Sequence, residues 1–166
     1  MNIRLEETAD WTAVYTIYAA AFGQSAEADL VQRIHKDGDL ILSLAAYDGS
    51  AGPVGHIVFS RLILNAAPGV KGAVLAPLAV VPSHQKHGIG SALVAEGLER
   101  LKQAGTDLVV VLGDPNFYGR FGFSPKLAKK LRTPYDGPYV QSLALSERGN
   151  EAHGPVSYAR AFAELK

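Results

Sequence analysis

Apolar and polar residues alternate along this chain in two kinds of pattern, and together these predict a mixed α/β protein. Alternation with a period of two, or a short apolar run, is typical of strands and occurs in residues 3–6, 40–47, 54–64, 73–81, 108–112, 139–145 and 156–162. Apolar residues at helical spacing occur in residues 14–22, 26–34, 89–101 and 116–121. The pattern therefore predicts a sheet of about seven strands flanked by about four helices.

The order of these elements predicts how the strands pair. Three strands between residues 40 and 81 follow one another through short loops, which indicates an antiparallel meander. The continuous apolar run 108–112 is typical of a strand buried on both faces, and the helix before it predicts a right-handed parallel crossover. Residues 124–138 are expected to form a loop, which carries the basic residues Lys126, Lys129, Lys130 and Arg132.

The stretch from residue 78 to residue 95 carries the first candidate chemistry. An apolar strand ends at Pro82, and a loop with two glycines then leads into a helix. The first turn of a helix has N–H groups without intrahelical partners and the positive end of the helix dipole, so it attracts phosphate. Gly88 and Gly90 have no Cβ and allow a diphosphate to approach the backbone. The residues Gln85–Ser91 are therefore predicted to bind phosphate, with an ordinary glycine-rich turn as the alternative.

Three phosphate-binding motifs can be compared with this loop. The dinucleotide fingerprint needs a glycine where this chain has Leu93, and the Gly-Lys-Ser/Thr sequence of the P-loop is absent. A nucleotide-binding domain is therefore disfavoured. The order Gln-x-x-Gly-x-Gly, beginning at Gln85 after a strand that contains Leu-Ala-Val, resembles the acyl-CoA pyrophosphate loop of the GNAT family of N-acetyltransferases.

A second motif, after the next strand, strengthens this resemblance. Tyr118 is followed by Gly122-Phe123 in the pattern Tyr-x-x-x-Gly-Phe. The longer runs Gly-Asp-Pro-x-x-Tyr-x-Arg-Phe-Gly-Phe and Leu-Ala-Pro-Leu-Ala-Val are similar to one bacterial branch of predicted N-acetyltransferases. The resemblance covers the chain and implies one domain over residues 1–166 with an α/β fold. It also implies a GNAT-type mixed, mostly antiparallel central sheet that opens at the cofactor strand.

The resemblance also implies a reaction, in which an amine directly attacks acetyl-CoA and accepts its acetyl group. The pantetheine arm is expected to run beside the backbone of residues 78–80, which would also supply an N–H donor for the oxyanion. The side chains of that strand are expected to pack in the core, and Lys86 and His87 to add charge near phosphate or to be solvated. The residues implied in cofactor binding are Leu78, Ala79, Val80, Gln85, Lys86, His87, Gly88, Ile89, Gly90, Ser91 and Asn116.

Two proton transfers need side chains or water. The resemblance makes Tyr118 the candidate acid for the leaving thiolate, with ring packing beside Phe121 and Phe123 as the alternative. For the base, Glu27 lies in the second helix, which borders the acceptor site in this family. His56 lies on a central strand, and its ordinary pKa near 6.5 suits deprotonation of an amine. The alternative for His56 is a purely structural role, and the alternative for Glu27 is an acidic residue that only stabilises the first turn of its helix. A chain of water molecules is the third candidate for the base.

Composition and charge exclude several classes of function. Sixteen basic residues balance 16 acidic ones, so the footprint of a nucleic-acid-binding protein is absent. The chain has no cysteine, which excludes disulfides, thiolate metal sites and a cysteine nucleophile. His84 and His87 are three residues apart, but no further ligand lies near them in the sequence, and no metal is expected.

Location, partners and substrate are less constrained. Acidic residues stand near the start of the chain, and no apolar run reaches the roughly 20 residues of a membrane span, so we expect a soluble, cytoplasmic protein with no membrane partner. The acceptor is expected to be the amine of a small molecule, a peptide or a protein, and a homodimer is compatible with the sequence. The alternative function is a non-catalytic acyl-CoA-binding or regulatory module on the same fold.

Overall fold

The structure is a computed structural model that describes residues 1–49, 51–135 and 137–164. Within these residues it contains eight strands and six α-helices, which confirms the mixed α/β class with slightly more elements than predicted. The chain forms two compact units. The first unit comprises residues 1–59, 77–99 and the described part of 160–166, and the second comprises residues 60–76 and 100–159.

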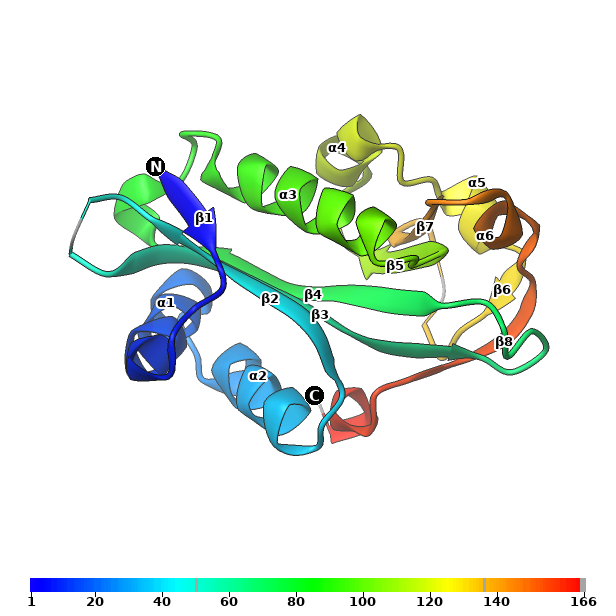
Figure 1. Cartoon of the computed structure of the whole chain (residues 1–166), viewed down its shortest axis with the longest axis horizontal. Coiled ribbons are helices and arrows are strands. Elements are labelled where there is room, and N and C mark those ends of the chain that lie inside the picture. Colours follow the sequence, from blue (N-terminus) through cyan, green and yellow to red (C-terminus); the bar gives the residue numbers. More distant parts are fainter. Residues whose placement is uncertain (50, 136, 165–166) are drawn as a thin grey trace. The chain divides into compact units, whose positions relative to one another are not determined.

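The first unit contains β1, β2, α1 and α2, together with the first part of β3, the last part of β4 and most of α3. Strand β1 pairs antiparallel with β2, with Ile3 opposite Ala46, and β2, β3 and β4 then follow in order. Helices α1 and α2 lie on one side of these strands, and α3 lies on the other (Figure 1). The bounds are β1 Asn2–Arg4, α1 Trp11–Phe22, α2 Ala26–Lys36, β2 Leu40–Tyr47, β3 Pro53–Leu64, β4 Gly72–Val80 and α3 Ile89–Gln103.

The second unit contains the remaining strands, three short helices, the end of β3, the start of β4 and the last residues of α3. Strand β4 pairs parallel with β5 from Gly72 opposite Leu108 to Leu75 opposite Val111, which confirms the predicted parallel pairing. Strand β7 pairs antiparallel with β5, β8 pairs antiparallel with the end of β3, and β6 pairs parallel with β8. The bounds are β5 Leu108–Leu112, α4 Pro115–Tyr118, α5 Pro125–Ala128, β6 Leu131–Arg132, β7 Val140–Ala144, α6 Glu147–Glu151 and β8 Gly154–Tyr158.

The structure differs from the sequence prediction in the last third of the chain. The expected loop 124–138 contains α5 and β6, and α6 was not predicted. Serine caps explain both helices: the Ser124 hydroxyl accepts from the N–H groups of Lys126 and Leu127, and that of Ser146 accepts from the N–H of Gly149. The expected strand 156–162 ends at Tyr158, and residues 160–164 form a 3-10 helix.

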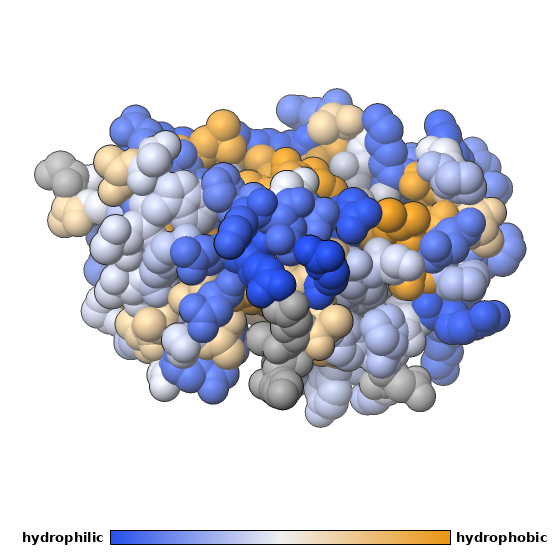
Figure 2. Space-filling model, turned by 90° about the horizontal axis from the view of Figure 1, so that it is seen from below, coloured by the Kyte–Doolittle hydropathy of each residue, from blue (hydrophilic) through white to orange (hydrophobic). Residues whose placement is uncertain are grey.

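Side-chain burial follows the predicted faces of the helices. In α3 the apolar residues Ile89, Leu93, Val94, Leu98 and Leu101 are buried, as the helical spacing predicts. The surface over α2 is strongly hydrophilic (Figure 2), since its polar residues face outward. No helix among the described residues combines the length and the apolar character that a membrane crossing requires.

Candidate functional site

The loop between β4 and α3 has the backbone geometry of an anion-binding turn. Lys86 has a φ of 66° and Gly88 a φ of 84°, so two residues in the left-handed region stand two positions apart. Turns of this kind direct successive N–H groups into one concavity. A hydrogen bond at the start of the helix runs from the Ala92 N–H to the Gly88 oxygen (3.0 Å), so the N–H groups of residues 89 and 90 precede the helical ladder. The loop therefore offers backbone donors and a helix dipole to a diphosphate.

Gln85 has a role that the sequence analysis did not foresee. Its side-chain Nε2 donates to the backbone oxygen of Val80 at 2.9 Å. This hydrogen bond ties the start of the loop to the last residue of β4. Because the side-chain amide is engaged in this bond, Gln85 would contact a bound cofactor through its backbone N–H.

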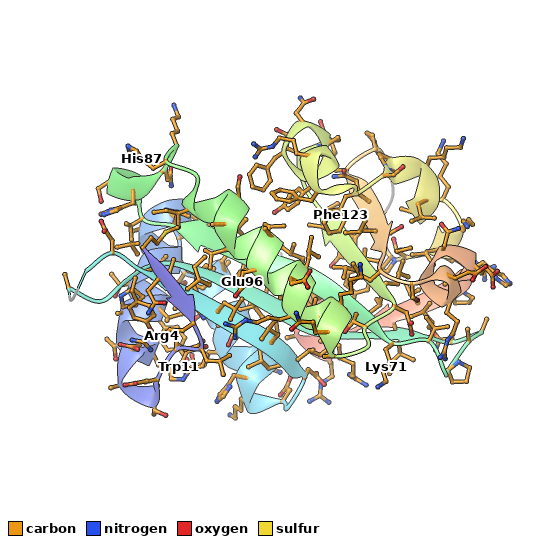
Figure 3. The ribbon with its side chains drawn as sticks, turned by 45° about the horizontal axis from the view of Figure 1, so that its top comes forward. Arg4, Trp11, Lys71, His87, Glu96 and Phe123 are labelled. Atoms are coloured by element: carbon orange, nitrogen blue, oxygen red, sulfur yellow. The ribbon has the colours of Figure 1, made fainter. Side chains whose placement is uncertain are left out.

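The histidines of this loop differ in their surroundings. His84 lies between the Ser83 hydroxyl (2.9 Å) and a carboxylate oxygen of Asp48 (3.2 Å). His87 lies in the loop before α3 (Figure 3), and both it and Lys86 are exposed. Among the described residues, no three side chains of His, Cys, Asp or Glu form a group that could hold a metal ion.

The end of β4 is the predicted path of the pantetheine arm. Ala79 is buried, while Leu78 and Val80 are half-buried. The hydrogen-bonded register of β4 with β5 comprises Gly72–Leu75, so residues 78–80 lie beyond it. The N–H of Val81 donates to the oxygen of Val54 on β3 (2.9 Å). Since backbone groups alternate in direction along a strand, the N–H groups of Leu78 and Val80 point away from β3.

Tyr118 ends the short helix α4 in the second unit. Its ring makes edge-to-face contacts with Phe117 and Phe123, with centroids 4.9 Å and 5.8 Å apart. Burial raises the pKa of Tyr118 to about 12, so the hydroxyl is protonated at neutral pH and is a hydrogen-bond donor. Asp114 caps this helix by accepting from the N–H of Asn116 (2.9 Å), and Asn116 itself is exposed. The ring is thus packed, as the alternative interpretation expected, and its hydroxyl is still a donor.

The two candidate bases lie in very different environments. Glu27 is half-buried at the start of α2, where both its carboxylate oxygens accept from Gln24 Nε2 (3.0 and 3.3 Å). His56 is completely buried. Its Nδ1 lies 2.8 Å from the hydroxyl oxygen of Tyr18, and its Nε2 lies 3.2 Å from Oε1 of Glu6. A ligand can therefore approach Glu27, whereas His56 can act only through its protein neighbours.

Glu6 and Tyr18 were not singled out from the sequence, although one signal was available. Tyr18 shares the apolar face of its helix with Val14 and Ile17, and all three are buried. A tyrosine on such a face carries a hydroxyl into the core, where it requires a hydrogen-bond partner. The identity of that partner depends on tertiary structure and could not be read from the spacing.

Comparison with known proteins shows similarity to N-acetyltransferases. The profile of the Acetyltransferase (GNAT) family matches residues 9–123. The uncharacterized N-acetyltransferase YhbS of Escherichia coli is 35% identical over 137 residues, which cover 82% of this chain and 81% of YhbS. The uncharacterized N-acetyltransferase YjhQ of Escherichia coli is 36% identical over 144 residues, which cover 83% of this chain and 76% of YjhQ.

Solved structures give the same result. The crystal structure of Escherichia coli YhbS in complex with CoA superposes with a TM-score of 0.92 at 32% identity, covering 99% of this chain and 93% of YhbS. A GNAT family acetyltransferase from Brucella melitensis in complex with acetyl-CoA superposes with a TM-score of 0.80 at 32% identity, covering 97% of both chains.

Proposed function

Since the chain belongs to the GNAT acetyltransferase family, we propose that this acetyl-CoA-dependent enzyme moves the acetyl group directly onto a primary amine. The observation that carries the proposal is the loop Gln85–Ser91, in which left-handed Lys86 and Gly88 lead into α3. CoA and acetyl-CoA are bound in the two similar structures described above, which supports acetyl-CoA as the co-substrate.

Cofactor binding is assigned mainly to backbone groups. The diphosphate of acetyl-CoA binds the N–H groups of residues 85–91, and the positive end of the α3 dipole favours its charge. The pantetheine arm follows residues 78–80, whose backbone lies beyond the β4–β5 register. Lys86 and His87 add positive charge beside the phosphates, and Asn116 is assigned here only by the motif it shares with Tyr118.

The chemical step forms one bond and breaks one. The amine nitrogen attacks the thioester carbon, a C–N bond forms, and a backbone N–H of the Leu78–Val80 strand binds the oxyanion. The C–S bond then breaks, and CoA leaves as a thiolate. The nitrogen loses one proton to a base, and the thiolate gains one proton on its way to solvent.

Tyr118 is assigned a role in stabilising the leaving thiolate of CoA. With a pKa of about 12 it is a weaker acid than a thiol, whose ordinary pKa is about 8.5, so complete proton transfer to the thiolate is uphill. We therefore assign Tyr118 a hydrogen bond to the sulfur as negative charge develops there. A donor in a half-buried site stabilises that charge more than water does.

Glu27 is assigned as the base that accepts the proton of the amine. Its carboxylate is half-buried and accepts hydrogen bonds from the exposed Gln24 side chain, a contact that a ligand can displace. A chain of water molecules is the alternative acceptor of this proton. The buried His56 is not assigned a direct role as the base.

The test is thiol release from acetyl-CoA with a panel of amines, comprising amino acids, spermidine, kanamycin and a peptide with a free N-terminus. Wild type, Tyr118→Phe and Tyr139→Phe are measured side by side, since Tyr139 lies in the same unit with 58% of its surface exposed. We expect release with one class of amine, a loss of roughly tenfold to a hundredfold in kcat for Tyr118→Phe, and wild-type rates for Tyr139→Phe.

Calorimetry with acetyl-CoA separates the alternatives. Binding without thiol release from any amine would favour an acyl-CoA-binding module over an enzyme of this specificity. Failure to bind acetyl-CoA would overturn the assignment of the Gln85–Ser91 loop. Equal rates for Tyr118→Phe and wild type would remove Tyr118 from the mechanism while leaving acetyl transfer in place.

A further inference from the structure

A continuous chain of polar groups crosses the core of the first unit. Glu6 Oε1 lies 3.2 Å from His56 Nε2, His56 Nδ1 lies 2.8 Å from the Tyr18 hydroxyl, and that hydroxyl donates to the backbone oxygen of Pro77 at 3.2 Å. His56 and Tyr18 have no exposed surface, and only 4% of the Glu6 side chain is exposed. The four groups come from the segment after β1, from α1, from β3 and from β4.

The ionisation states within this chain follow from its surroundings. Burial opposes ionisation of Glu6, but the neighbouring His56 and the Ser43 hydroxyl outweigh it, so the pKa of Glu6 lies below its ordinary value. Burial and the Glu6 charge raise the pKa of Tyr18 well above its ordinary value. Glu6 is therefore a carboxylate and Tyr18 a neutral donor at physiological pH.

Because Tyr18 is neutral, its hydroxyl is a hydrogen-bond donor within the core. The Tyr18 hydroxyl carries one proton and has two acceptors in reach, His56 Nδ1 and the Pro77 oxygen. When Nδ1 itself holds a proton, it donates to the Tyr18 oxygen, and the Tyr18 proton is then directed to Pro77. Oε1 of Glu6 lies 3.2 Å from the other ring nitrogen and helps to hold the imidazole in this position.

The acceptor at the end of this chain belongs to a peptide group at the proposed cofactor strand. The Pro77–Leu78 peptide is planar, and in a trans peptide the C=O and the N–H point in opposite directions. A hydrogen bond that holds the Pro77 oxygen toward Tyr18 therefore holds the Leu78 N–H away from α1. The same hydrogen bond polarises the amide and makes its N–H a stronger donor.

We propose that Tyr18, held by His56 and Glu6, is a positioning residue that aims the Leu78 N–H at the thioester oxygen of acetyl-CoA. The inference rests on the proposed acetyl transfer, and it narrows the oxyanion donor from a strand to one amide. It also gives a reason for a carboxylate, an imidazole and a phenol in this core, since in proteins apolar residues often replace buried charged groups without loss of stability.

The dipeptide Pro77-Leu78 gives an unusually selective probe, because Leu follows none of the other eight prolines in the chain. Labelling proline with ¹³C at the carbonyl and leucine with ¹⁵N therefore yields one cross-peak in an HNCO spectrum. That peak reports the Pro77 carbonyl and the Leu78 N–H together. The probe ligand is acetyl-dethia(carba)-CoA, in which a methylene group replaces the sulfur and the thioester becomes a stable ketone.

Tyr18→Phe is compared with Tyr47→Phe, a matched control in the same unit. The Tyr47 hydroxyl donates to Asp10 Oδ2 (2.7 Å), so this variant also loses the hydrogen bond of a buried tyrosine hydroxyl, but one without a link to β4. In wild type and Tyr47→Phe we expect acetyl-dethia(carba)-CoA to move the Leu78 N–H downfield. In Tyr18→Phe we expect a changed Pro77 carbonyl shift without ligand and a smaller response of the Leu78 N–H to it.

Kinetics with the best amine of the panel provide a second readout. Tyr18→Phe is expected to lower kcat roughly tenfold or more, with the KM for acetyl-CoA within twofold of wild type, because the loss falls on the transition state. Circular dichroism checks that the variant is folded. If it is not, Glu6→Gln is used instead, because glutamine has nearly the same shape as glutamate. It is expected to shift the Pro77–Leu78 cross-peak in the same direction as Tyr18→Phe, but by a smaller amount.

The outcomes separate this inference from the proposed function. A cross-peak in folded Tyr18→Phe that matches wild type with and without ligand would overturn the positioning role. So would binding of acetyl-dethia(carba)-CoA to wild type without any shift of the Leu78 N–H, since acetyl-CoA binding would then stand without this donor. Failure of wild type to bind the analogue would overturn the proposed function itself.

Discussion

The Cβ atom that Gly113 lacks would lie 2.5 Å from Cε2 of Tyr118. The aromatic ring therefore rests directly on the bare backbone of the turn between β5 and α4. This turn is fixed on two sides, because Gln141 Nε2 donates to the Gly113 oxygen (3.0 Å) and the Gly113 N–H donates to the Tyr139 oxygen (2.9 Å). Gln141 is completely buried. Gly113 thus sets the position of the Tyr118 ring.

We predict that Gly113→Ala displaces Tyr118 and lowers kcat to within about threefold of Tyr118→Phe, because a methyl group occupies the space of the ring. Its free energy of unfolding should fall by about 1–3 kcal/mol. Gly119→Ala is the matched control, since its Cβ would meet nothing within 4 Å and its φ of −58° suits alanine. Thermal unfolding and thiol release test both variants. Wild-type kcat in Gly113→Ala would argue against a catalytic hydroxyl at Tyr118.

A second prediction concerns the pH dependence of Tyr118. Because burial raises its pKa to about 12, the hydroxyl stays protonated up to about pH 10. The ratio of kcat for wild type to that for Tyr118→Phe is therefore expected to be constant between about pH 7 and pH 10. Thiol release measured over this range with one amine tests the expectation. A ratio that approaches one by pH 9 would mean that Tyr118 ionises there.

The fold was predictable from the sequence where the pattern of apolar residues within one segment was enough to indicate a strand or a helix. The apolar runs give the bounds of β2 at 40–47 and of β5 at 108–112, and the helix between β4 and β5 gives their parallel pairing. The helices α5 and α6 have four and five residues, which is too short for an apolar period to develop. Their serine caps were a weaker signal that could have indicated them.

The candidate site divides in the same way. The loop Gln85–Ser91 was predictable because glycine and the start of an amphipathic helix are local features. The contacts of His56 were not, since Glu6, Tyr18 and Pro77 are brought to it from three separate parts of the chain. The bond from Gln85 to Val80 spans only five residues, but a sequence motif does not specify whether its glutamine binds the ligand or the backbone.

A third prediction concerns stability in acid. Asp107 is buried and accepts from the Lys71 N–H (2.8 Å) and the Ser146 hydroxyl (2.7 Å). Burial opposes its ionisation, but these bonds and the nearby Arg148 charge outweigh it, so the pKa of Asp107 lies below its ordinary value. A group with a lowered pKa stabilises the folded state above its unfolded pKa, and this contribution is lost as the pH falls through the folded pKa.

Asp107→Asn is therefore expected to lose roughly 1–3 kcal/mol of unfolding free energy at pH 7, since an amide cannot accept both hydrogen bonds. The difference from wild type should shrink as the pH falls below about 4, where the wild-type carboxylate also becomes protonated. Urea unfolding at several pH values measures both effects. Asp29→Asn, at an exposed position in α2, is the control and should cost roughly 0.5 kcal/mol. A difference that grows in acid would contradict the assignment.

A fourth prediction separates strain from charge in the phosphate loop. Lys86 has a left-handed φ of 66°, which costs a residue with a side chain about 1 kcal/mol or more. Lys86→Gly is expected to raise the free energy of unfolding by about 0.5–1 kcal/mol, while Lys86→Ala keeps the strain and should change it little. Calorimetry with CoA should show the same loss of affinity for both variants, decreasing with added salt. A destabilised Lys86→Gly would mean that the lysine side chain stabilises the loop.

The fifth prediction links the helix that carries this loop to the sheet beneath it. A Cβ on Gly97 of α3 would lie 2.4 Å from Cε2 of Phe59, a buried residue of β3. Gly97→Ala should therefore destabilise the protein by about 1–3 kcal/mol, although alanine favours a helix by about 1 kcal/mol over glycine. The helix must shift to admit the methyl group, and we expect weaker CoA binding because the loop at its N-terminus shifts with it.

Phe59→Leu makes this prediction specific. Leucine is shorter than phenylalanine, so in the double variant Gly97→Ala/Phe59→Leu the new methyl group gains space. The double variant is expected to lose less unfolding free energy than the two single variants lose together, by about 1 kcal/mol or more, because the two sites are in contact. CoA affinity should return toward wild type with it. Additive losses of stability would show that α3 accepts the methyl group without moving against Phe59. The weaker CoA binding of Gly97→Ala would then need a different cause from a shifted loop.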